Sequence, residues 1–280
     1  MKLQRIAIAV TSLALLLGSA YEPASAANRS AASSAAAASN ATQSQKNIKA
    51  QVDAVALKKK NPGEIYYVYV NDKKYNPGGY AYQAFSYGLP FKNYEQYVQK
   101  AESLKPPFLQ LPQAPEGFKF NSAYIGAYKP NPKTIEGQKL SKQVVAEGKA
   151  SGKQVYIKKV TDKRLNVSLT YKENSSTPSG QAFLAITAEP AGTLDPTIEY
   201  VPALAEPEKL EVEGQELTYK TGDALVYKTA NSPAINSSQG AHYLEWVDSR
   251  TQISYTIYLS GGDTKKEALV GVAEQIITGQ

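Results

Sequence analysis

The stretch that decides the fold lies near the carboxyl end, where residues 242–277 read HYLEWVDSRTQISYTIYLSGGDTKKEALVGVAEQII. In the first part, Leu244 and Trp246 fall on one face of a strand, opposite Tyr243. After a turn at 248–250, apolar residues alternate with mostly polar ones, and the apolar set is Ile253, Tyr255, Ile257 and Leu259. This pattern predicts a β-hairpin with one strongly apolar face.

A helix is predicted directly after this hairpin. Gly261 and Gly262 permit a break in the chain, and Asp263 or Thr264 can cap the helix that follows. Its apolar residues recur at helical spacing, at Leu269, Val272, Ala273 and Ile276. We therefore expect the helix to close over the apolar face of the hairpin.

From residue 118 onward, the chain shows short strand-like segments separated by turn residues. The segments are 118–128, 154–160, 164–171, 181–188, 209–212, 215–220 and 224–229, followed by the hairpin. Strands at short intervals, with helices only at the edges, favour an α+β fold. The prediction for residues 112–280 is a curved antiparallel sheet packed against the C-terminal helix.

A smaller, helical and tyrosine-rich segment precedes this domain and spans residues 46–111. Its first helix has one apolar face, formed by Ile48, Val52, Val55 and Ala56. Residues 64–70 read EIYYVYV, a run of strong strand formers. Asn93 can cap a second helix, whose apolar face comprises Tyr94, Tyr97, Val98, Ala101 and Leu104.

The C-terminal pattern resembles the domain of unknown function 4367 family of exported or membrane-anchored Gram-positive proteins. The matching elements are 244–246, 253–257 and 273–276, and the entry at 115–118 and the hairpin at 209–220 are also similar. The resemblance covers roughly residues 112–277. It implies a fold and an exported location, and it carries over no activity and no catalytic residue.

The first 26 residues have the features of an export signal. Lys2 and Arg5 precede an uncharged, mostly apolar run at 6–17, and Ala24-Ser25-Ala26 is a signal-peptidase site. The apolar run is shorter than the roughly 20 residues that a membrane-spanning helix needs. Cleavage after Ala26 would leave 254 residues with a net charge of +5. Residues 27–45 are rich in Ala and Ser, which predicts a disordered tether.

The amino-acid composition limits the classes of function that this protein can have. The chain has no cysteine and one histidine, which excludes disulfides and thiolate metal sites. Together with the short signal, the absence of cysteine favours a secreted bacterial protein at the cell envelope. The basic residues are spread along the sequence, with Lys58-Lys59-Lys60 the longest run, so we expect no nucleic-acid partner. We expect no cofactor and no metal.

Residues suited to catalysis are scarce. His242 would need a carboxylate and a nucleophile within reach, and no known nucleophile motif accompanies it. The remaining option is a pair of glutamates, Glu211 with Glu213 or Glu206 with Glu208, which would share a strand face. A solvated strand face explains these glutamates more simply, so the prediction is that the protein is not an enzyme.

The twenty tyrosines are the most unusual feature of the composition. The candidate binding residues are those concentrated near the strand at 64–70, namely Tyr66, Tyr67, Tyr69, Tyr80 and Tyr82. Tyrosine suits recognition surfaces because it combines an apolar ring with a polar tip. Two arrangements stay open: an exposed patch that binds a ligand, or a tyrosine-rich core.

The sequence as a whole predicts a secreted, non-catalytic binding or sensory domain at the bacterial cell envelope. Its expected partner is a cell-wall glycan or another envelope protein. Two alternatives stay open. One is a hydrolase of cell-wall polymers that uses the paired glutamates, and the other is a carrier that holds a lipid-like ligand in the concavity of the sheet.

Overall fold

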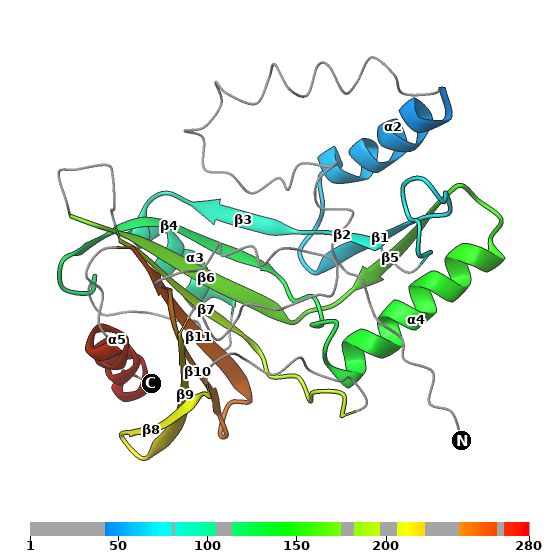
Figure 1. The fold of residues 1–280 in the computed structure, drawn as a ribbon. Coiled ribbons are helices and arrows are strands. Elements are labelled where there is room, and N and C mark those ends of the chain that lie inside the picture. Colours follow the sequence, from blue (N-terminus) through cyan, green and yellow to red (C-terminus); the bar gives the residue numbers. More distant parts are fainter. Residues whose placement is uncertain are drawn as a thin grey trace, which may run out of the picture. The chain divides into compact units, whose positions relative to one another are not determined.

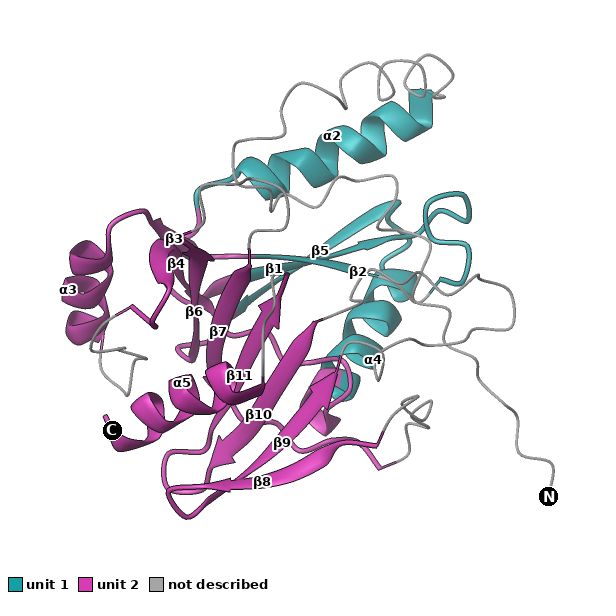
Figure 2. Cartoon of the chain, turned by 60° about the vertical axis from the view of Figure 1, so that its left-hand side comes forward, with its two compact units in different colours: residues 1–59, 65–85, 138–160 teal, residues 60–64, 86–137, 161–280 magenta. Residues whose placement is uncertain are grey.

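The computed structural model describes residues 43–79, 82–104, 114–174, 182–196, 206–221, 241–261 and 266–279. The fold is α+β, with two antiparallel sheets of three and eight strands (Figure 1). The chain divides into two compact units. Residues 1–59, 65–85 and 138–160 form the first, and residues 60–64, 86–137 and 161–280 form the second (Figure 2).

The first unit is built around the three-stranded sheet. Its elements are α2 (Gln43–Leu57), β1 (Glu64–Val70), β2 (Tyr82–Ser86), most of α4 (Ile135–Ala150) and β5 (Val155–Thr161), with strand order β2-β1-β5. The central strand β1 is buried along its whole length. A strand covered on both faces has no polar alternation, which is why EIYYVYV reads as a continuous run of strand formers.

Alternate residues of β1 belong to different layers of this unit. Tyr66, Val68 and Val70 join a cluster with the apolar face of α2, in which Ile48, Val52 and Val55 are buried as predicted. Ala56, which the same prediction included, is exposed. On the other side, the ring of Tyr69 lies against Gly148 of α4. The sheet is therefore sandwiched between two helices.

The second unit contains the eight-stranded sheet, in the order β3-β4-β6-β7-β11-β10-β9-β8. Its strands are β3 (Gly88–Phe91), β4 (Phe118–Ala127), β6 (Leu165–Glu173), β7 (Phe183–Pro190), β8 (Glu208–Val212), β9 (Gln215–Thr221), β10 (His242–Asp248) and β11 (Ile253–Ser260). Helices α3 (Tyr94–Leu104) and α5 (Lys266–Thr278) contribute buried residues to the same core, and α5 contacts β8, β10 and β11.

The C-terminal hairpin and helix form as predicted. Strands β10 and β11 pair so that Trp246 lies opposite Tyr255, and their rings stack with centroids 4.9 Å apart. The four residues predicted for the inner face of α5 are all buried. Figure 2 shows α5 lying across β10 and β11. At the other helix, the side chain of Asn93 accepts a hydrogen bond from the backbone N–H of Gln96, which confirms the predicted cap of α3.

Helix α4 is not predicted by the sequence, because Gly137 and Gly148 interrupt it and Val144 is its only buried large apolar residue. The short strands β2 and β3 are also absent from the prediction. Helix α2 begins at Gln43, so the predicted tether at 27–45 overlaps it by three residues. The predicted strand at 224–229 and the export signal lie outside the described residues.

The two units do not follow the predicted division into residues 46–111 and 112–280. Strand β5 pairs with β1, far away in the sequence, and most of α4 belongs to the first unit as well. Strand β3 and helix α3 lie within residues 46–111, the predicted N-terminal segment, but they belong to the second unit. Long-range strand pairing decides this division, and short-range sequence patterns carry no information about it.

Candidate functional site

The tyrosines proposed as an exposed patch are mostly part of the core. Tyr66, Tyr67 and Tyr69 are 5%, 2% and 1% exposed, so they cannot form a recognition surface. Tyr82 is half-buried and packs its ring edge-on against Tyr67, with centroids 5.6 Å apart. Tyr80 lies outside the described residues. For β1, the tyrosine-rich core is the arrangement found, because helices cover both faces of the strand.

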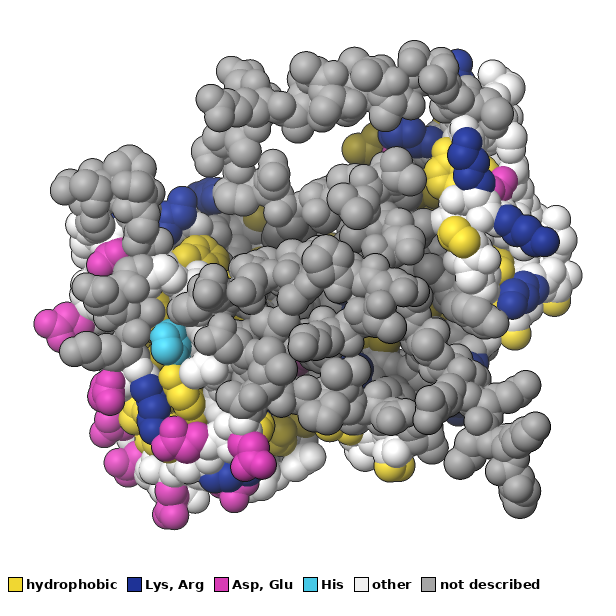
Figure 3. Space-filling view, viewed as in Figure 1, with side chains coloured by type: hydrophobic (Ala, Val, Ile, Leu, Met, Phe, Trp, Pro, Cys, Tyr) yellow, Lys and Arg dark blue, Asp and Glu magenta, His cyan; other side chains and the backbone are white. Residues whose placement is uncertain are grey.

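The described part of the first unit instead carries a large excess of positive charge. Its described residues include twelve lysines and only three acidic residues. The lysines are Lys46, Lys49, Lys58, Lys59, Lys73, Lys74, Lys139, Lys142, Lys149, Lys153, Lys158 and Lys159. All except Lys158 are exposed. We call these twelve residues, which lie on α2, α4, β5 and the adjoining loops, the lysine surface; Figure 3 shows some of the Lys and Arg side chains on this unit.

The three acidic residues in the described part of this unit all interact with nearby groups. Asp53 pairs with Lys49 one turn away on α2, at 2.5 Å. Asp72 accepts hydrogen bonds from the backbone N–H groups of Lys74 and Tyr75 at 2.9 and 3.3 Å. Glu147 is held by Lys158. The described lysines of this unit therefore outnumber its described carboxylates by nine, and eleven of these lysines are exposed.

Glu147 on α4 connects this helix to β5. Its carboxylate accepts hydrogen bonds from Lys158 Nζ at 2.7 and 2.8 Å, from the Tyr156 hydroxyl at 2.5 Å and from Gln143 Nε2 at 2.9 Å. The hydrogen bonds from Lys158 and Tyr156 lower the pKa of the Glu147 carboxyl to about 2. This cluster is a charged clamp between two elements, and its carboxylate stays ionised well below neutral pH.

Two lysines of the lysine surface converge on one buried ring. The ammonium group of Lys58, just after α2, lies 5.0 Å from the centroid of the Tyr66 ring, and that of Lys159 on β5 lies 5.9 Å from it. The negative face of an aromatic ring attracts cations at such distances. Tyr66 therefore helps to hold two like charges near each other at the surface of the first unit.

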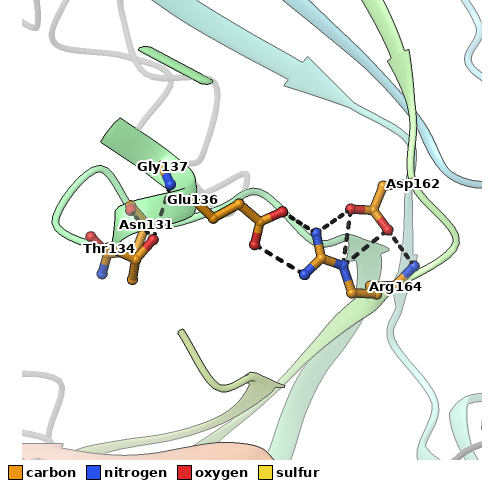
Figure 4. Close-up of polar contacts among 6 residues, drawn as sticks. All are labelled: Asn131, Thr134, Glu136, Gly137, Asp162 and Arg164. Carbon is orange, nitrogen blue, oxygen red and sulfur yellow. Dashed lines mark hydrogen bonds and ion pairs between the residues drawn. The ribbon is translucent and has the colours of Figure 1, made fainter. Parts of the chain in front are cut away.

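A second charged cluster lies in the second unit, around Arg164 (Figure 4). Its guanidinium donates to Asp162 at 2.7 Å and to both oxygens of Glu136, and it lies 4.8 Å from the centroid of the Tyr128 ring. Hydrogen bonds to Glu136 and Asp162 raise the pKa of Arg164. Burial raises the pKa of Asp162, but the hydrogen bonds from Arg164 outweigh it and leave that pKa below its ordinary value.

This arginine cluster fixes the start of α4. Thr134 caps the helix, since its hydroxyl accepts a hydrogen bond from the backbone N–H of Gly137 at 3.1 Å (Figure 4). A Cβ at position 137 would lie 1.9 Å from the carbonyl oxygen of Asn131, so only glycine fits there. With Arg164 fully occupied by two carboxylates, the cluster has the features of a structural clamp.

The residues considered for catalysis are dispersed. The hydroxyl of Tyr219 and Nδ1 of His242 are hydrogen-bonded at 2.6 Å, and among the described residues this partner, rather than a carboxylate, orients the imidazole. Glu211, Glu213 and Glu206 are exposed, and Glu208 is exposed and pairs with Lys266. A glycosidase needs one carboxyl whose pKa is raised by burial, and exposed glutamates on a hairpin do not meet that requirement.

The remaining features of the described residues are few. No group of three or more His, Asp or Glu side chains could hold a metal ion in the described part of the chain. In the same residues, no helix has the length and apolar character needed to cross a membrane.

Neither family models, nor curated proteins, nor solved structures match this chain. The resemblance to the domain of unknown function 4367 family therefore stays a prediction.

Proposed function

We propose that this protein is a secreted, non-catalytic binding domain of the bacterial cell envelope, and that the lysine surface binds an anionic envelope polymer. One observation carries the proposal: the described part of the first unit has twelve lysines and three carboxylates. A charge of one sign concentrated on one unit raises the local concentration of oppositely charged polymers. The expected ligand class is a cell-wall glycan or polymer that bears phosphate groups.

The distribution of charge within the chain supports this choice of surface. The described part of the second unit has eighteen acidic residues against thirteen basic ones, so it is net acidic. Figure 3 shows acidic side chains gathered around the β8–β9 hairpin. Attraction to an anionic polymer is therefore expected from the first unit alone. Each lysine near an anionic surface contributes about 1 kcal/mol at low ionic strength.

The two alternatives receive less support. The hydrolase requires facing carboxylates in a cleft, and the candidate glutamates are exposed on strands and turns of the β8–β9 region. The lipid carrier requires an apolar hollow. The hollow at this hairpin is lined mainly by Lys209, Glu211 and Glu216, which suits a lipid chain poorly. Binding is the activity that the arrangement of side chains favours.

The proposal is tested by binding of the full chain to poly(glycerol phosphate) at low salt. The variant Lys73→Glu/Lys142→Glu/Lys153→Glu reverses three exposed lysines of the lysine surface. We expect its affinity to fall about 100-fold. The matched control Lys92→Glu/Lys119→Glu/Lys163→Glu makes the same charge change on exposed lysines of the second unit. This control is expected to bind within about threefold of the wild type.

An equal loss of affinity in both variants would overturn the proposal, because it would show a response to net charge and not to this surface.

The exported location is tested by a separate experiment. Expression in a Gram-positive host is expected to place the protein outside the membrane with Ala27 as its first residue, measured by mass spectrometry. An intact N-terminus in the cytosolic fraction would contradict it.

A further inference from the structure

The two faces of the eight-stranded sheet differ in chemistry. On one face, side chains such as Leu169, Ile186 and Ile257 are buried in the core with α3 and α5. The residues between them, which point to the other face, are half-buried along β6, β7 and β11. This alternation is typical of a sheet with one face in the core and the other accessible.

The accessible face is rich in hydroxyl groups arranged in rows across the strands. The cross-strand register aligns one row as Tyr124, Ser168, Thr187, Thr256, Glu245 and Thr218. A neighbouring row aligns Ser122, Thr170, Ala185, Tyr258, Tyr243 and Lys220. In the first row, hydroxyls that both donate and accept thus follow each other across four adjacent strands, β4, β6, β7 and β11.

Three aromatic rings lie together on this face. Tyr243 and Tyr258 are directly opposite on β10 and β11, with ring centroids 4.9 Å apart and planes inclined by 53°. Phe183 on β7 approaches Tyr258 with centroids 6.4 Å apart. All three side chains are half-buried, so part of each remains accessible. The three residues form an aromatic strip that runs across three adjacent strands.

Charged side chains flank the aromatic strip at both ends. At one end, Lys172 on β6 lies directly opposite Phe183 in the strand register, and Lys119 on β4 lies opposite Lys172. Lys220 and Glu245, on β9 and β10, form an ion pair at 2.5 Å. Burial raises the pKa of the Tyr243 hydroxyl, so this ring stays neutral at all ordinary pH values. The groups that dominate this face are aromatic rings and hydroxyls, in contrast to the lysine surface. Its chemistry therefore suits a ligand with an apolar ring face and many hydroxyl groups.

We propose that the aromatic strip and the adjacent hydroxyl rows bind an uncharged pyranose oligosaccharide. The apolar C–H face of a pyranose ring covers an aromatic ring and removes its surface from water, while the sugar hydroxyls exchange hydrogen bonds with Thr187, Thr256 and the Lys220–Glu245 pair. A lipid chain would leave those polar groups without partners, which costs free energy. The inference rests on the second unit and is independent of the lysine surface.

The test measures binding of a hexamer of β-1,4-linked N-acetylglucosamine by calorimetry in 0.5 M salt, where attraction to the lysine surface is largely screened. We expect Tyr258→Ala and Tyr243→Ala each to weaken binding about tenfold, since each removes one stacking ring. Tyr258→Phe keeps the ring and is expected to bind within about threefold of the wild type. The variant Lys73→Glu/Lys142→Glu/Lys153→Glu is expected to bind the hexamer normally.

Saturation-transfer NMR on the unmodified chain keeps the test valid if an alanine variant fails to fold. We expect magnetisation transfer from the protein to the ring protons of the sugar, lost when Ala185→Arg places a long charged side chain beside Tyr258 on the same face. Absence of hexamer binding to the wild type would overturn the inference. So would binding that Tyr258→Ala or Ala185→Arg leaves unchanged, or binding that the triple lysine variant abolishes.

Discussion

Gly148 of α4 lies so close to Tyr69 of β1 that a Cβ at position 148 would be 2.4 Å from the ring carbon Cδ1. The Tyr69 ring is 1% exposed and has no space into which it could move. A glycine in the middle of a helix normally costs stability, because alanine favours the helix by about 1 kcal/mol. Here the glycine allows the helix and the central strand to pack directly on each other.

Gly148→Ala is therefore expected to destabilise the protein by about 1–3 kcal/mol, because steric overlap outweighs the gain in helix propensity. Gly271→Ala is the matched control, since a Cβ there meets nothing within 4 Å. It lies inside α5 and should gain up to about 1 kcal/mol. Urea unfolding of both variants measures the difference. A stabilising Gly148→Ala would show that the contact with Tyr69 is not tight.

Glu147→Gln tests the charged clamp between α4 and β5. The folded-state pKa of Glu147 is about 2, below its ordinary value, so the ionised form stabilises the fold at neutral pH. This contribution is complete above the unfolded-state pKa and disappears as the pH falls toward 2. The variant should therefore be less stable than the wild type at pH 7, and the two should converge near pH 2.

Thermal unfolding as a function of pH measures this convergence. Glu102→Gln, at an exposed position on α3, is the control and should follow the wild type throughout. A Glu147→Gln variant whose deficit stays constant between pH 7 and pH 2 would show that the carboxylate contributes through packing and not through its charge.

Arg164→Lys tests the arginine clamp at the start of α4. A lysine keeps the charge but loses the planar geometry with which Arg164 binds Asp162 and Glu136 together. Because these groups are partly exposed, the expected loss is modest, about 0.5–1 kcal/mol. Arg250→Lys, whose nearest carboxylate is 3.9 Å away, should change nothing measurable. Chemical denaturation at low and at 0.5 M salt should show the Arg164→Lys deficit shrinking as salt increases.

Leu269→Ala tests how α5 closes the core of the second unit. Leu269 is fully buried among residues of the eight-stranded sheet, so its truncation leaves a cavity. The expected loss is about 2–5 kcal/mol. Val270→Ala removes a half-buried neighbour on the same helix and should cost about 1 kcal/mol. Equal losses in the two variants, measured by urea unfolding, would contradict the assignment of Leu269 to the inner face.

Elements with a strong local pattern could be predicted well. The β10–β11 hairpin, the four inner residues of α5 and the Asn93 cap of α3 all depend on contacts within a few residues, and their sequence spacing indicates them. Helix α4 could not be predicted, because its two glycines read as helix breakers. Those glycines reflect close approaches to Tyr69 and Asn131, which are visible only once the chain is folded.

The candidate binding surfaces also include features that the sequence could predict and features that it could not. The sequence by itself determined the α+β fold class, the C-terminal helix that covers the core, and the scarcity of groups suited to catalysis. These features depend on periodicity and composition, which are local properties. It could not show that Tyr66, Tyr67 and Tyr69 lie inside, since that depends on which helices cover β1. Only the tertiary structure collects lysines from three separate stretches into one unit, because charge acts through space and not along the chain.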